Sequence, residues 1–127
     1  MSKEIIVSAI ILIAIIVLNI CMSQYIDKKM NYVVTKLGEL KGELEVENFD
    51  ESQKKIDEID EYWKNSENIL SFFIEHDELE KVITELTSLK AYIKLEDSEE
   101  AIETLDKMTF IINHIEEKDD LKLKNIF

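Results

Sequence analysis

The hydrophobic pattern of the chain starts with one long apolar stretch, Ile5 to Met22, which contains no charged residue. Only Ser8 and Asn19 are strongly polar within it. Its Ile, Leu and Val side chains each favour membrane insertion by about 0.3 to 0.6 kcal/mol, so about 4 to 7 kcal/mol together. As a helix the stretch is about 27 Å long, close to the thickness of a bilayer core. The pattern predicts one transmembrane helix, with Tyr25 at the membrane interface.

Two other interpretations compete with an uncleaved anchor. A cleaved signal peptide has a shorter apolar core and a small-residue cleavage site, and the only small-residue candidate here, Cys21 to Ser23, is a poor one. A lipoprotein signal would use Cys21, but the preceding Ile20 occupies a position where such signals have a small side chain. We therefore expect the anchor to be retained.

Beyond the anchor, apolar residues recur with the alternating three- and four-residue spacing of a helix seam, which predicts a helix from Ile26 to about Glu45. The seam residues are Ile26, Met30, Val33, Leu37, Leu40 and Leu44. Gly38 and Gly42 lie four residues apart in this segment and indicate either close approach of another helix or a weak helix end.

Three further amphipathic helices are predicted, each opened by an Asn or Asp followed three residues later by Glu. The caps are Asn48, Asp77 and Asp97, and the second helix is expected to reach about Glu75. The helix after Asn48 has the expected apolar face Ile56, Ile59, Trp63, Leu70 and Phe73, widened by Tyr62, Ile69 and Phe72. The helix after Asp77 has the face Leu79, Val82, Ile83, Leu86, Leu89 and Ile93. The helix after Asp97 has the face Ala101, Ile102, Leu105, Met108, Ile112 and Ile115.

These elements predict an all-α fold, in which a single N-terminal transmembrane helix continues into an antiparallel bundle of about four helices. We expect an anchor over residues 1–25, an acidic bundle over 26–118 with His114 and Lys118 in its last turn, and a tail over 119–127. A weak internal echo leaves a tetratricopeptide-like array as an alternative. The tail either folds back over the open end of the bundle or is an extended peptide offered to a partner through Ile126 and Phe127.

The charge of the chain excludes one class of partner. It has 28 acidic residues against 15 basic ones, a net charge of −13, and every basic residue is Lys. Nucleic-acid binding needs basic patches, so we expect none. The single Cys excludes an internal disulfide and a Cys-based zinc site.

No catalytic motif is present in the sequence, and we expect neither an enzyme nor a cofactor. The best metal candidates are His76, Asp77 and Glu80 at a helix junction, with His114 if the fold brings it near. The more economical interpretation is helix capping, so no metal site is assigned. Trp63 could be a ligand platform, but its spacing indicates a core residue. Asn19 either hydrogen-bonds a neighbouring helix in the membrane or reaches toward the interface.

Several segments together resemble a known family. They are the N-terminal anchor, the Trp63 helix, Phe72 to Glu78, Ser88 to Ile93, Ile112 to Ile115, and Leu121 to Phe127. The sequence resembles domain-of-unknown-function family 4363, small membrane-anchored proteins of endospore-forming Firmicutes. The resemblance implies a cell-envelope setting and a link to sporulation membrane proteins, and it supplies no catalytic residues.

These observations favour a single-pass, membrane-anchored interaction module, an accessory subunit that holds another membrane protein or associates with itself through the anchor. Asn19, Ile126 and Phe127 are its candidate partner-binding residues. The alternative is an extracytoplasmic ligand-sensing or divalent-metal-binding domain that signals through a partner protein. Lys28, Lys29, Lys36 and Lys41 favour a cytoplasmic bundle. The signal-anchor form of the first residues and the resemblance favour an extracytoplasmic one, which we predict.

Overall fold

Four helices and three short turns make up the chain. The computed structural model describes residues 2–126, and the side chains of all of these except Leu123 and Ile126. The helices are α1 (Lys3–Glu45), α2 (Phe49–Leu70), α3 (His76–Lys94) and α4 (Ser98–Ile126). The described residues contain no strand, which confirms the all-α prediction.

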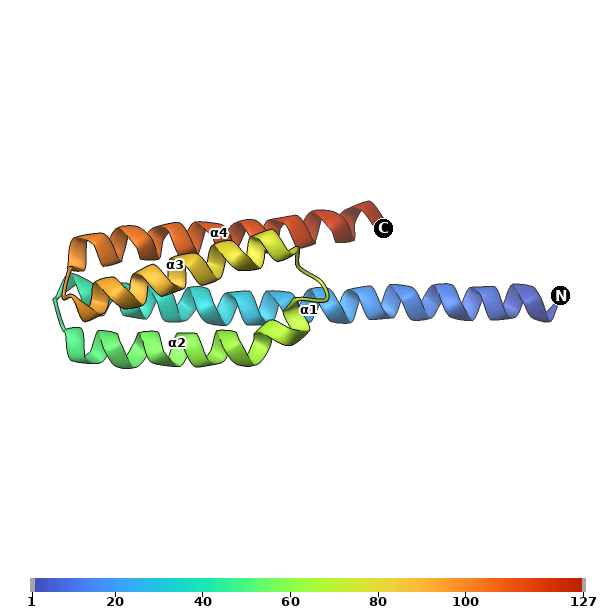
Figure 1. Cartoon of the computed structure of the whole chain (residues 1–127). Helices are drawn as coiled ribbons and strands as arrows, with labels where there is room; N and C mark the ends of the chain where they lie inside the picture. The colour runs from blue at the N-terminus through green and yellow to red at the C-terminus, as the bar shows by residue number, and fades with distance from the viewer. Residues whose placement is uncertain (1, 127) are drawn as a thin grey trace.

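The helices form one antiparallel bundle, from which the first half of α1 projects alone (Figure 1). Helix α1 contacts α2 and α4, and α3 contacts the same two helices from the other side. Contact between α1 and α4 joins the first helix to the last. This closes the bundle and excludes the open repeat array.

The seam of α1 forms one side of the hydrophobic core, as its spacing predicts. Its six apolar residues, Ile26, Met30, Val33, Leu37, Leu40 and Leu44, are all at most 1% exposed. Because α1 continues without a break from Lys3, the apolar stretch and the core seam belong to one rigid helix.

The other helices bury most of their predicted faces. Trp63 is buried in the core, and Ser66 occupies the polar gap in the face of α2, where its hydroxyl donates a hydrogen bond to the Tyr62 carbonyl. The predicted faces of the second and third helices include three residues that are exposed rather than buried. Ile69, Phe72 and Ile83 are exposed, because they lie beside the buried stripe of their segment rather than on it.

Two of the turns share one construction. Glu47 and Glu96 adopt positive φ angles of 56° and 57°, the left-handed conformation that ends a helix. The residue after each donates its backbone N–H to a carbonyl five residues earlier, Asn48 to Glu43 and Asp97 to Tyr92. The side chains of Asn48 and Asp97 then cap the next helix, which confirms both predicted caps.

Three predicted helix boundaries are wrong. Helix α2 ends at Leu70 rather than near Glu75, because the Ser71 hydroxyl and three-residue hydrogen bonds at Phe72 and Phe73 tighten the chain into a turn. Helix α3 starts at His76, so Asp77 lies within its first turn and is not the cap.

The third error is at the end of α4, which runs to Ile126 rather than ending near Lys118. Residues 119–126 therefore neither fold back over the bundle nor form an extended peptide.

The two glycines do not mark an approach of helices within the bundle. A Cβ atom added at Gly38 or Gly42 would meet nothing within 4 Å, because both residues face outward. Nor do they end the helix, which continues to Glu45.

The projecting half of α1 is long and apolar enough to cross a membrane. None of its most apolar window is buried in the structure. Its Ile, Leu and Val side chains therefore face outward on nearly every side.

Candidate functional site

The sequence-predicted metal candidates lie on the surface of α3 and α4. His76 Nε2 is 3.1 Å from Glu80 Oε1, a pair one helical turn apart in which both side chains are largely exposed. Asp77 and His114 are also exposed. Among the described residues, none of these four belongs to a group of three or more ligand atoms close enough together to hold an ion.

A different set of carboxylates gathers where α1 leaves the bundle. Asp27 of α1 and Asp119 and Asp120 of α4 offer oxygen atoms that all lie within 4.8 Å of one another. We call these residues, together with the neighbouring Glu116, the anchor-side carboxylate cluster. Oxygen ligands of this kind suit Ca²⁺ or Mg²⁺.

Hydrogen bonds and ion pairs around the cluster fix the register of α1 against α4. The buried Ser23 hydroxyl donates a 2.9 Å hydrogen bond to Asp119 Oδ2. Lys118 Nζ is 3.4 Å from Glu75 Oε2 and thereby ties α4 to the start of α3. Within the described residues, the buried Oδ1 atom of Asp27 has no hydrogen-bond partner.

Burial and mutual repulsion shift the protonation of the cluster. Burial raises the pKa of Asp27, and the charges of Asp120 and Asp119 raise it further. Burial likewise raises the pKa of Glu116, reinforced by Asp27, Asp120 and Asp119. Both groups resist ionisation because the charged form loses water and meets negative neighbours.

This cluster predicts a specific dependence of stability on pH. Asp27 holds its proton more tightly in the folded than in the unfolded protein, so the free energy of unfolding falls as pH rises from about 4 through the raised pKa. We expect Asp27→Asn to be more stable than the wild type at pH 7. We also expect it to lose the Asp27 part of the pH dependence.

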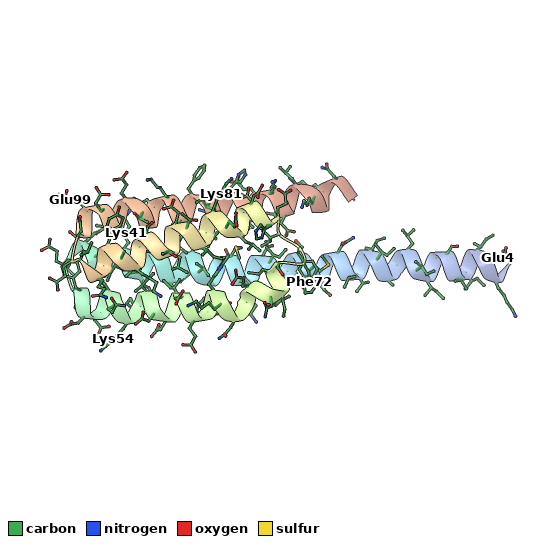
Figure 2. All side chains as sticks on the ribbon, viewed as in Figure 1. Glu4, Lys41, Lys54, Phe72, Lys81 and Glu99 are labelled. Carbon is green, nitrogen blue, oxygen red and sulfur yellow. The ribbon has the colours of Figure 1, made fainter. Side chains whose placement is uncertain are left out.

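Chemical denaturation of the full chain in mild detergent with a chelator, from pH 3 to pH 8, measures this effect. Glu99→Gln removes the same charge at the opposite end of the bundle and is the matched control (Figure 2). A wild type and an Asp27→Asn variant that lose stability in parallel over this range would show that Asp27 is not the titrating group.

The predicted partner-binding residues are placed only in part. Asn19 is half-buried and lines a hollow with Met22 and Ser23 of α1, Phe72 and Phe73 of the α2–α3 turn, and Asp119 and Lys122 of α4. It therefore faces α4. Phe127 and the side chain of Ile126 lie outside the described residues.

A second hollow lies between α2 and α3, over Trp63. It measures about 270 Å³ and is lined by apolar side chains and by the ion pairs that Lys64 and Lys90 form with Asp60, at 3.0 and 2.9 Å. Burial tends to raise the pKa of Asp60, but hydrogen bonds from the two lysines outweigh burial and lower it. The indole Nε1 of Trp63 is buried without a hydrogen-bond partner among the described residues.

Sequence reasoning missed the anchor-side carboxylate cluster because its members lie far apart in the chain. One signal could have found it. Ser23 and Asn19 continue the seam of α1 beyond Ile26, and Asp119 continues that of α4 one turn beyond Ile115. Polar residues at consecutive seam positions of two antiparallel helices indicate a polar contact between them.

Comparison with known proteins places the chain in a family. No curated protein and no solved structure matches it. A family model described as "Domain of unknown function (DUF4363)" matches residues 20–126, which include the bundle and the end of the apolar stretch. On this match, which confirms the resemblance seen in the sequence, the chain belongs to family DUF4363.

Proposed function

We propose that this protein is a single-pass, membrane-anchored module that holds another membrane protein of the cell envelope and carries out no catalysis. The exposed apolar half of α1 supports membrane insertion, since nothing in the bundle covers its most apolar window. The continuity of α1 supports a rigid link between the anchor and the bundle, because a partner that binds the anchor also fixes the orientation of the bundle.

The observation that carries the proposal is an exposed face of α1 with little charge. It runs along the bundle half of the helix at the spacing of a helix seam and consists of Gln24, Lys28, Asn31, Thr35, Gly38 and Gly42. Lys28 is its only charged residue, on a protein of net charge −13. The open space above both glycines would let a partner helix approach closely. We call these six residues the outer face of α1.

Co-purification of the full chain from membranes in mild detergent tests the proposal. Because leucine is a good helix former and the space above the glycines is open, Gly38→Leu with Gly42→Leu should leave the bundle folded. The same change should block close approach of a partner, and we expect loss of most of a stoichiometric partner. Lys54→Leu, at an exposed site on α2, adds a leucine away from the outer face and should retain the partner.

Asn19 and the end of α4 are the second place where a partner could bind. If the partner binds at this second place, Asn19→Leu should weaken its retention, and so should removal of residues 121–127. The helical circular dichroism of both variants should persist. A partner retained by these variants and by the double leucine variant must bind the acidic faces. Salt should then release it, because exposed charges are screened beyond about 8 Å at physiological ionic strength. If no stoichiometric protein copurifies with the wild type, the proposal fails.

We place the bundle on the outer side of the membrane, which the cell-envelope setting implied by the family resemblance favours, whereas the lysines after the apolar stretch favour the inner side. A membrane-impermeant amine reagent applied to intact protoplasts should therefore label lysines of the bundle, such as the exposed Lys54. Labelling only after the protoplasts are lysed would place the bundle in the cytoplasm.

One observation favours a second candidate function, the binding of a divalent cation. The unpartnered Oδ1 of Asp27 lies within the anchor-side carboxylate cluster, where a cation would compensate both its burial and the repulsion between the carboxylates. Millimolar Ca²⁺ or Mg²⁺ should then raise the melting temperature of the wild type but not of Asp27→Asn, and Glu99→Gln should respond as the wild type does. An equal response of all three proteins would rule this function out.

A further inference from the structure

The end of the bundle nearest the apolar stretch exposes apolar side chains that the core does not use. Phe72, in the α2–α3 turn, is 81% exposed, more than any other large apolar side chain among the described residues. Ile69 at the end of α2 and Leu121 near the end of α4 are also exposed. Figure 2 shows Phe72 at the side of the bundle from which α1 projects. We call Ile69, Phe72 and Leu121 the anchor-side rim.

Phe72 lies at the level of the last turn of the apolar stretch. It shares one hollow with Asn19, Met22 and Ser23 of α1. If the stretch from Ile5 to Met22 crosses the membrane, these α1 residues lie at its boundary. The α2–α3 turn is then brought to the membrane surface by its position in the fold.

Helix α4 reaches farther along the apolar stretch than the α2–α3 turn does (Figure 1). The hydrogen bond between Ser23 and Asp119 sets these two residues at one level. From Asp119, α4 continues to Ile126, which is about 10 Å farther at 1.5 Å per residue. Over residues 3–22 of α1, the residues that are not fully exposed are Ile16, Asn19 and Met22, and the last two line the hollow that Asp119 and Lys122 of α4 also line.

The apolar stretch is too short for the end of α4 to lie wholly outside the bilayer. At about 27 Å, the stretch barely spans a hydrocarbon core of about 30 Å, so residues 16–22 must lie close to one boundary. The last two turns of α4 lie beside them, from the headgroup region down to the outer edge of the hydrocarbon core. Lys122 and Lys124 suit that depth, because a lysine stem can lie along lipid while its ammonium group reaches water and phosphate.

We propose that the anchor-side rim lies in the headgroup region of the bilayer that holds α1, with the ring of Phe72 in contact with lipid, and that residues 121–126 of α4 continue from there to the outer edge of the hydrocarbon core. The inference rests on the membrane insertion in the proposed function and adds a second, lipid-facing surface. This contact holds the bundle at a fixed tilt and height, so that the outer face of α1 meets a membrane partner in one orientation.

A depth measurement on the full chain in nanodiscs tests this contact. Trp63 is the only tryptophan, so Trp63→Phe gives a background into which a single reporter can be introduced. Phe72→Trp reports on the rim. Phe110→Trp is the matched control, because Phe110 is 73% exposed in the middle of α4. Leu18→Trp reports on insertion of the anchor itself.

We expect brominated lipids to quench the reporter at residue 72 at least about twofold more than the control at residue 110, because an interfacial ring lies at the level of the headgroups. Aqueous iodide should quench the control more than the reporter at residue 72. Quenching of the reporter at residue 18 by brominated lipids is expected as well. If that quenching is absent, the anchor is not inserted, and the proposed function fails together with this inference.

Two results would overturn the inference alone, with the anchor inserted. A reporter at residue 72 that behaves like the one at residue 110 would place the rim in water. A reporter protected from both quenchers would place it under protein, either a second copy or a partner.

A nitroxide label at Phe72→Cys, in a Cys21→Ser background with Trp63 intact, repeats the test at the rim without changing the core. Oxygen should reach this label more readily than a water-soluble nickel complex does, and a label at Glu99→Cys should show the opposite order. The same order at both positions would contradict the lipid contact.

Discussion

Replacing Trp63 with alanine is expected to destabilise the bundle by about 3 to 5 kcal/mol, the usual cost of removing a fully buried aromatic side chain. Trp63 is 1% exposed and packs where α2 meets the rest of the core. Its indole Nε1 has no partner among the described residues, so the substitution removes apolar contacts without breaking a hydrogen bond there. A loss of this size is a large part of the stability of a small domain, about 5 to 15 kcal/mol.

Thermal unfolding of the full chain in mild detergent, followed by circular dichroism, measures this effect. A loss of this size should lower the melting temperature by more than about 10 °C in a bundle of this length. Phe110→Ala removes an aromatic side chain of the exposed surface and should change it little. If Trp63→Ala melts with the wild type, the packing of α2 described here is incorrect.

Placing two lysines in the apolar stretch, as Ile10→Lys with Ile13→Lys, is expected to release the protein from the membrane. Each lysine near the centre of a transmembrane helix costs about 2.5 to 3.5 kcal/mol, and each lost isoleucine adds a few tenths more. The total of about 5.5 to 8 kcal/mol matches or exceeds the 4 to 7 kcal/mol by which the stretch favours insertion. Both isoleucines are exposed, so the bundle should remain folded.

Extraction of membranes with alkaline carbonate measures the change. The wild type and the conservative variant Ile10→Leu with Ile13→Leu should stay in the pellet, and the double lysine variant should move to the supernatant with its helical spectrum intact. A double lysine variant that resists extraction would show that the protein is held by something other than this stretch.

The core could be predicted from the sequence because periodicity alone determines it. The six seam residues of α1 repeat at alternating intervals of four and three residues, and this spacing places them on one helix face whatever the other helices do. Asn48 and Asp97 could also be predicted, because each combines a capping side chain with a following acidic turn. In both cases the structure follows from interactions between near neighbours.

The boundaries around residues 70–77 could not be predicted in the same way. No glycine or proline marks the α2–α3 turn, and several successive residues, Glu75, Asp77 and Glu78, suit the start of a helix because negative charge there complements the helix dipole. Tertiary packing decides among them. Lys118 of α4 pairs with Glu75 and Glu78, so the start of α3 depends on a residue 43 and 40 positions later in the chain.

The anchor-side carboxylate cluster and the rim depend on the register of α1 against α4. Asp27 and Asp119 become neighbours only because α1 continues unbroken through this level and α4 does not end near Lys118. The sequence pattern of residues 121–127 alternates apolar and polar residues, which resembles a strand or extended peptide more than a helix. In the structure residues 121–126 continue α4 as a helix. The prediction of a separate tail therefore missed the part of α4 that lies beside the apolar stretch.

Reactivity of single cysteines along α1 tests the central claim most directly, namely that one helix carries both a membrane-spanning half and the core of the bundle. In a Cys21→Ser background, Ile13→Cys lies in the apolar stretch, and Asn31→Cys and Thr35→Cys lie on the outer face of α1. In nanodiscs that hold the purified protein alone, where both surfaces are accessible and no partner covers the outer face, a charged maleimide should label residues 31 and 35 and leave residue 13 unlabelled. Labelling of residue 13 as fast as residue 31 would contradict the claim.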